Sequence, residues 1–372
     1  MNRTTISNFQ IMTLAVGTVA SAKIFMVQQQ LVLISKQDAW ISMLLGSILT
    51  QLSAMNIYYL SILNPGKDLP QIYLQNFGKV LGRFLLIGGI IYIFTYICVI
   101  TKVFTEVVKT FLLTETPATF ISVLLILTII TVVRKGVESI TKMSNIIAPF
   151  FLITLFLIII LSAKEANIAN IKPILYKNTL NVLKGAIPAY ASFLGHTFIS
   201  FLLLYTPEPK KTFKWYMIGI AIPMFIYTLL TFMTMLVFDP TEVETMMYPT
   251  LSLSKSIEFP ITLLERLEIL MIIIWIPAMF IAISTYLYAN IRSIVVFFNL
   301  KEKHHTYLAY LYLIPIVLTF YVTQDSIQTI DYINTIEIFG TIQVGVMLPI
   351  ITLISLIRNK KEKKKQKQNI SP

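Results

Sequence analysis

Charged side chains are scarce in this sequence. Only 13% of the 372 residues are Asp, Glu, Lys or Arg, whereas 56% are hydrophobic. A typical soluble domain carries about 25% charged residues, and the mean hydropathy of +0.76 is far above the soluble range. The composition therefore excludes an ordinary soluble domain and predicts an integral membrane protein.

Cysteine and histidine are also rare. The single cysteine, Cys98, cannot form an internal disulfide, and the three histidines are His196, His304 and His305. The sequence offers no Cys/His ligand set, no glycine-rich phosphate loop and no nucleophile motif. We therefore expect no enzyme activity, no metal site and no cofactor.

Long apolar runs predict an all-α fold of ten transmembrane helices, because each run suits a hydrocarbon core of about 30 Å. If both termini are cytoplasmic, the inside segments hold 20 Lys and Arg residues and the outside segments hold 9. This asymmetry follows the positive-inside rule, so the net charge of +12 reflects topology and not nucleic-acid binding. The predicted spans cover residues 9–34, 39–62, 84–111, 117–133, 144–163, 186–206, 215–238, 261–290, 307–323 and 335–357.

The predicted membrane domain covers residues 1–357, and a basic cytoplasmic tail covers 358–372. The tail contains the run RNKKEKKKQK, which should lie against anionic lipid headgroups. Near the other end, Ala20-Ser21-Ala22 resembles a signal-peptidase site. Hydrophobicity continues to Ile34, however, so we expect the first span to be retained.

Two spans contain residues that interrupt helices. The sixth has Pro188 and Gly195, and the first has the small-residue run GTVASA at 17–22 followed by Lys23. Proline removes a backbone donor, and glycine weakens a helix by about 1 kcal/mol. Breaks at positions one and six predict two inverted repeats of five helices, about 8–163 and 186–357, with a site between the breaks. A kinked helix without a ligand remains the alternative.

Lys23 needs a partner, because an ammonium group near the membrane midplane costs several kcal/mol unless it is paired or hydrated. We expect it to face a cavity or a carbonyl cluster, and we hypothesise that it replaces a bound cation and removes any sodium requirement. The sequence offers no convincing buried carboxylate for proton coupling. Lys102 and Glu106, at i,i+4, are interpreted as a solvated ion pair and not as an ion-coupling site.

The backbone groups that a helix break exposes indicate the class of ligand. A broken helix presents free N–H groups at one edge and free carbonyls at the other, which complement a carboxylate and an ammonium group. The expected ligand is therefore a small amino acid or a similar polar metabolite. His196 is interpreted first as an imidazole bonded to a nearby carbonyl, and as part of the site in the alternative. Ala282 and Tyr286 share a helix face that suits either packing or ligand contact.

Several segments together resemble the B subunits of spore germinant receptors, which belong to the amino acid–polyamine–organocation superfamily and have a LeuT-type fold. The resemblance covers about residues 7–360. It implies a spore inner-membrane subunit that binds a nutrient germinant, commonly an amino acid, and triggers germination with a membrane A subunit and a lipoprotein C subunit. An amino-acid transporter of the same superfamily is the alternative. The segments are KQDAWI at 36–41, FLG at 193–195, TPEPKK at 206–211, YPTLSL at 248–253 and ERLE at 265–268 with Trp275.

The resemblance also implies a ligand pocket on helices one, three, six and eight. Many members have glycine at the first break and proline shortly after it. This chain has Ser21-Ala22-Lys23 instead, with no proline before Gln28. The ligand-binding residues carried over are Ser21, Ala22, Tyr96, Leu194, Gly195, Ala282 and Tyr286.

Overall fold

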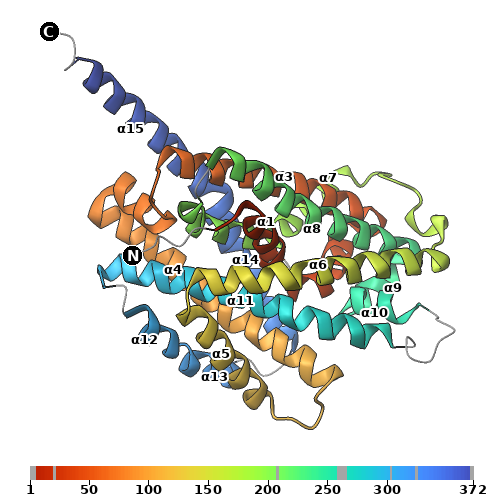
Figure 1. The fold of residues 1–372 in the computed structure, drawn as a ribbon. Helices are drawn as coiled ribbons and strands as arrows, with labels where there is room; N and C mark the ends of the chain where they lie inside the picture. The colour runs from red at the N-terminus through yellow and green to blue at the C-terminus, as the bar shows by residue number, and fades with distance from the viewer. Residues whose placement is uncertain are drawn as a thin grey trace.

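The structure is a computed structural model that describes residues 6–19, 22–206, 209–257, 266–301, 304–322 and 326–368. Within these ranges the regular structure is entirely helical. Figure 1 shows the helices packed in a bundle, from which the end of α15 (Leu348–Gln368) projects. The predicted all-α class is confirmed.

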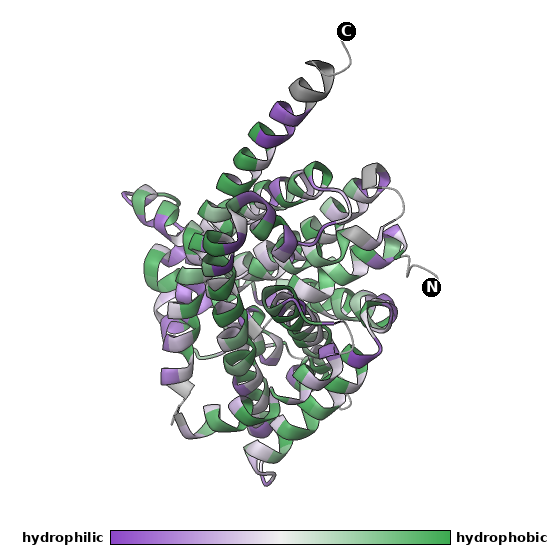
Figure 2. Cartoon of the chain, turned by 90° about the vertical axis from the view of Figure 1, so that its left-hand side faces the viewer, coloured by the Kyte–Doolittle hydropathy of each residue, from purple (hydrophilic) through white to green (hydrophobic). Residues whose placement is uncertain are grey.

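Six helices in the described ranges are long and apolar enough to cross a membrane. Each overlaps one predicted span, and some outward side chains stay more than half exposed, such as Leu52 at 57% and Ile153 at 65%. Figure 2 shows hydrophobic residues over much of the outside of the bundle, as contact with lipid requires. These helices include α3 (Ala39–Leu63), α4 (Leu69–Phe111), α6 (Val137–Ser162), α8 (Pro209–Val237), α11 (Leu267–Phe298) and the continuous run of α14 (Ser326–Ile342), η8 (Gln343–Met347) and α15.

The other four predicted spans are short or interrupted. The breaks expected in the first and sixth spans are present, whereas the division of the ninth span was not expected. The sixth span also begins earlier than predicted, at Thr179. The elements are α1 (Asn8–Val19), η1 (Ala22–Phe25) and α2 (Val27–Ser35); α5 (Ala118–Arg134); α7 (Thr179–Ala191), η5 (Leu194–Phe201) and η6 (Leu203–Tyr205); and α12 (His304–Tyr310) with α13 (Leu313–Val322).

The entry into α4 shows how local sequence sets a boundary. Asp68 accepts a hydrogen bond from the Gln71 backbone, and the Gln71 side chain accepts one from the Asp68 backbone, both at 3.1 Å. This capping box starts the helix. Gly78, with φ +73°, then separates a short amphipathic turn from the membrane-spanning part.

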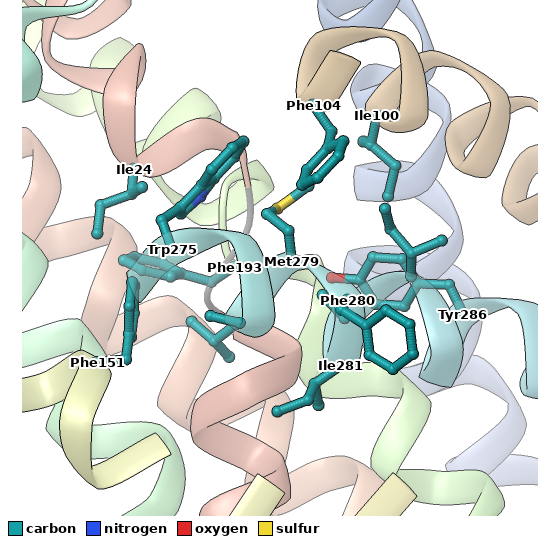
Figure 3. Close-up of a cluster of buried hydrophobic side chains, with 14 of the residues drawn as sticks. Ile24, Ile100, Phe104, Phe151, Phe193, Trp275, Met279, Phe280, Ile281 and Tyr286 are labelled. Atoms are coloured by element: carbon teal, nitrogen blue, oxygen red, sulfur yellow. The ribbon is translucent and has the colours of Figure 1, made fainter. Parts of the chain in front are cut away.

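The first break lies inside the bundle. α1 packs against α6, α8 and α11, and all its residues from Thr13 to Val19 are buried. Beyond the break, the ring of Phe25 lies 4.7 Å from that of Trp275, which stacks on Phe104 at 5.6 Å (Figure 3). Protein therefore encloses the chain on both sides of the break, as irregular backbone at membrane depth requires.

The contact between α3 and α7 depends on Gly46. A Cβ atom at this position would lie 2.7 Å from the Tyr190 backbone nitrogen, so the two helices would have to separate. We expect Gly46→Ala to destabilise the protein by about 1–3 kcal/mol, the usual cost of overpacking. Thermal unfolding in detergent measures the change. Gly88→Ala is the control, because its Cβ would meet nothing closer than 3.6 Å; equal stability of the two variants would contradict this account.

Candidate ligand-binding site

The two helix breaks meet at Gly195. α1 ends at Val19, and the freed carbonyl of Thr18 accepts a hydrogen bond of 2.5 Å from the Tyr286 hydroxyl. A Cβ atom on Gly195 would overlap both the Thr18 carbonyl oxygen and the Tyr286 hydroxyl. Glycine is therefore required here, because the backbone of η5 approaches the end of α1 too closely for a side chain.

Aromatic rings complete this contact. The ring centroid of Tyr286 lies 5.6 Å from that of Tyr96 in α4 and 4.3 Å from that of Phe198 in η5. Ala282, one helical turn before Tyr286, is fully buried on the same helix. Figure 3 shows Tyr286 among Ile100, Met279 and Phe280 in the buried cluster. This contact draws on α1, α4, η5 and α11, which belong to the first, third, sixth and eighth predicted spans.

Leu194, Ala22 and Ser21 were also carried over from the resemblance. Leu194 belongs to a separate core cluster with Ile57, Tyr190 and Val344. Ala22 begins η1, and Ser21 lies outside the described residues. The structure therefore brings together Tyr96, Gly195 and Tyr286 with the end of α1, and turns Leu194 toward α3 and η8.

A small cavity of about 50 Å³ adjoins this contact, because Phe198 belongs to both. Its lining includes Tyr92 of α4, Thr197 and Phe198 of η5, and Gln343 of η8. At the contact itself, the Tyr286 hydroxyl and the Phe198 ring fill the space between the breaks. In this conformation the site is closed around its own side chains.

Lys23 sits in a cage of oxygen atoms. Its Nζ lies 2.9 Å from Glu337 Oε2, 3.0 Å from Gln30 Oε1 and 3.1 Å from Asn334 Oδ1. The Lys23 and Glu337 side chains are only 5% and 2% exposed. The expectation that Lys23 needs partners is confirmed, and those partners are side-chain oxygens.

Glu337 corrects the expectation that the chain lacks a buried carboxylate. The tenth span was predicted to begin at residue 335, which placed Glu337 at a membrane surface. α14 instead begins at Ser326, so Glu337 lies well inside the helix. A signal was present in the sequence, because the buried Lys23 needed a counter-charge and Glu337 was the only acid in the last apolar run.

A larger cavity of about 510 Å³ reaches Lys23 from the side of α9 (Pro240–Thr245). Next to Thr245, which lines this cavity, Glu244 forms an ion pair with Lys36 at the end of α2. This pair and the Gln29 side chain, which donates to the Glu244 carbonyl, hold α9 over α2. The cavity is lined by Lys23, Met26, Gln29, Gln30, Leu33, Thr245, Met247, Ile330, Asp331, Ile333 and Asn334.

The solvated interpretation of Lys102 and Glu106 is wrong. Their side chains are 5% and 18% exposed, with Nζ 3.6 Å from Oε1, and Lys102 also lies over the Phe320 ring. Nearby Tyr248 precedes α10 (Pro249–Lys255), and burial and the Glu106 charge raise its pKa. α13 and α14 cover this end of α4, which helical periodicity alone could not indicate.

His196 follows the simpler interpretation. Its Nδ1 lies 2.7 Å from the Phe193 carbonyl and its Nε2 lies 2.9 Å from Ser53 Oγ. Both ring nitrogens are thus occupied, and the side chain is fully buried. The imidazole ties the sixth span to α3.

The Lys23 cage generates a stability prediction. In Lys23→Met, the Glu337 carboxylate would lose its buried counter-charge, which costs about 3–5 kcal/mol. The thermal midpoint in detergent should therefore fall sharply. Lys142→Met is the control, because the Lys142–Glu138 pair is more than half exposed at both ends and should contribute about 0–1 kcal/mol. Similar midpoints for the two variants would show that the cage contributes little.

Comparison with known proteins places these features in context. Residues 5–330 match the family described as spore germination protein. Among curated relatives of Bacillus subtilis, spore germination protein YndE is 28% identical over 68% of this chain and 69% of its own length. Spore germination protein B2 is 24% identical over 85% and 84%, and spore germination protein KB is 25% identical over 89% and 90%.

Solved structures of transporters share the fold. The nucleobase-cation-symport-1 transporter Mhp1, in a closed conformation with bromovinylhydantoin bound, has a TM-score of 0.69 at 9% identity, over 94% of this chain and 78% of that one. A Na⁺-coupled sialic acid symporter has a TM-score of 0.59 at 13% identity, over 95% and 79%. The fold is therefore of the LeuT type, with its first and sixth helices broken. The family match over residues 5–330 covers most of the chain and shows that the chain belongs to the spore germination protein family.

Proposed function

We propose that this chain is the B subunit of a nutrient germinant receptor. It binds a small germinant between its two helix breaks, and this binding triggers spore germination. Membership of the spore germination protein family and the transporter-type fold support the proposal. The observation that carries it is the contact of Thr18, Gly195 and Tyr286, which joins both breaks to α11.

The proposed ligand is an amino acid. Backbone N–H groups at the interrupted sixth helix, near Leu194 and Gly195, suit a carboxylate. Tyr96, Ala282 and Tyr286 would bound the ligand from α4 and α11, while Ser21 and Ala22 would approach it from the first break. Because Tyr286 and Phe198 fill the space in this conformation, binding requires these side chains to separate. Such a change gives the subunit two states for a signal.

The proposal includes partners and a location. A membrane A subunit and a lipoprotein C subunit would receive the signal in the spore inner membrane. Both termini would face the cytoplasm, as the lysine and arginine distribution indicates. There the basic end of α15, which projects from the bundle in Figure 1, would contact anionic lipid.

An amino-acid transporter of the same superfamily is the second candidate. The observation that favours it is the buried Lys23–Glu337 pair, because intramembrane ion pairs often mark ion or proton pathways. Lys23 also supports the cation-surrogate hypothesis, since its ammonium group occupies a three-oxygen cage that could otherwise hold a cation. Ligand binding should then be independent of sodium.

Proteoliposomes that contain this chain alone separate the two candidates. Binding and uptake of a labelled amino-acid panel are measured in parallel, with and without sodium. Binding without accumulation, equal in both media, supports a receptor that retains a transporter's site. Accumulation against a gradient would make the chain a transporter, and absence of binding to every amino acid would refute the proposed ligand class.

Tyr96→Ala tests the position of the pocket. Removing this ring deletes one wall of the site, and we expect ligand affinity to fall at least about tenfold, equivalent to 1.4 kcal/mol. The protein level should not change. Tyr59→Ala is the control, because Tyr59 is 45% exposed on the outer face of α3. Wild-type affinity in Tyr96→Ala would place the pocket elsewhere.

A further inference from the structure

Glu337 has one carboxylate oxygen committed and one available. Its Oε2 lies 2.9 Å from Lys23 Nζ in the ion pair, and its Oε1, like Oε2, accepts no hydrogen bond from the residues that the structure describes. The side chain is only 2% exposed. A buried carboxylate oxygen without a donor is costly, so native structures rarely keep one without a function.

This carboxylate stands beside the site at the helix breaks. Gly340, one turn further along α14, is packed so closely on Tyr92 that a Cβ atom would overlap the tyrosine hydroxyl. The Tyr92 ring in turn stacks on the Tyr96 ring at 6.1 Å, and the Tyr96 ring lies 5.6 Å from that of Tyr286. A row of tyrosines on α4 and α11 therefore connects α14 near Glu337 to the site, and η1 supplies the cation Lys23.

Three carbonyl groups of the described residues at the first break are already bonded to side-chain hydroxyls. The Thr18 carbonyl accepts from Tyr286, and the Val19 carbonyl accepts from the Tyr227 hydroxyl at 3.3 Å. Further along, the Ile24 carbonyl accepts from Thr250 Oγ1 at 2.6 Å. A ligand ammonium group would have to displace these donors in order to use the carbonyls. Glu337 Oε1 offers a charged acceptor without that displacement.

A second buried acid does not compete for this role. Glu268 also has an unpaired oxygen, but it lies in the first turn of α11, 3.3 Å from Arg266. Tyr286 lies five helical turns further along the same helix. Among the described residues, Glu268 and Glu337 are the buried acids with an unpaired oxygen, and of these two Glu337 has the position that fits the site.

We propose that Glu337 Oε1 binds the ammonium group of the ligand and makes the site selective for zwitterions. This assignment rests on the proposed amino-acid function and deepens it. Glu337 and Lys23 together carry no net charge, and a zwitterion preserves that neutrality when it enters. A simple amine would add a buried positive charge and a simple carboxylic acid a negative one, and both are costly in a low-dielectric interior.

The test compares three ligands on the full-length chain in proteoliposomes. Each labelled amino acid that binds is compared with the carboxylic acid that lacks its amino group and with the amine that lacks its carboxylate. The wild-type chain should prefer the amino acid over both analogues by about 100-fold or more. In Glu337→Gln, the preference over the carboxylic acid should fall to within about tenfold.

Two further variants keep the result interpretable. Lys23→Met/Glu337→Gln removes both charges, so it avoids leaving Lys23 buried without its counter-ion. Because it lacks the charged acceptor for the ligand ammonium group, its preference over the carboxylic acid should also fall. Glu138→Gln, on the exposed face of α6, should retain the wild-type preference. Size-exclusion profiles and thermal midpoints identify the folded variants.

The outcomes separate the two proposals. If the wild-type chain binds amino acids and the folded Glu337 variants retain its full preference, the assignment of Glu337 is overturned and the proposed function stands. If the wild-type chain binds no amino acid, the proposed function fails, and the role of Glu337 fails with it. Loss of preference in both Glu337 variants, but not in Glu138→Gln, supports the assignment.

Discussion

The structure depends on satisfying the backbone groups that two broken helices release inside a membrane. Lipid supplies no hydrogen-bond donors, so each freed carbonyl must find one within the protein. Tyrosine and threonine hydroxyl groups fill this role: Tyr286 donates to Thr18, Tyr227 to Val19 and Thr250 to Ile24. These donors come from α11, α8 and α10, so the first break becomes the point at which distant parts of the chain are joined.

The same donors connect the fold to the proposed function. A hydroxyl group that bonds a freed carbonyl can exchange it for a ligand with little net loss of hydrogen bonding, whereas an unsatisfied carbonyl would be unstable. Tyr286 is at once the donor to Thr18 and the ring that packs on Tyr96 and Phe198. Movement of this one side chain would therefore alter both the closed contact and the packing of four helices.

The buried charges add a second link across the bundle. Lys23 in η1 and Glu337 in α14 are far apart in sequence, yet their pair joins the first broken helix to the last membrane helix. Charges buried in this way are weak evidence for stability, because desolvation offsets much of their attraction. Two features are the reason to assign them a functional role: the 510 Å³ cavity reaches Lys23, and α14 packs closely on Tyr92 one turn after Glu337.

Much of this architecture follows from local sequence. Apolar runs located the membrane segments, and Pro188, Gly195 and the small residues before Lys23 located both breaks, because helix interruption is a local property of the backbone. The resemblance, and not periodicity, singled out Tyr96, Gly195 and Tyr286 together; the structure places them in contact, and their role in ligand binding stays a prediction. Glu337 was missed because the start of α14 was placed too late, and the exposure of Lys102 was misjudged because α13 and α14 cover it.

The sequence by itself determined that the chain is an all-helical membrane protein with interruptions in its first and sixth spans. Hydrophobicity and helix-breaking residues act over a single turn or a single span. They can therefore be recognised in the sequence without knowing which helices pack against that span. Only the tertiary structure decided which side chains meet at those interruptions. Leu194 faces a separate cluster while Gly195 faces Thr18, and Lys23 finds Glu337 more than 300 residues away. Such pairings depend on how the helices pack against one another, and a local sequence pattern does not predict that packing.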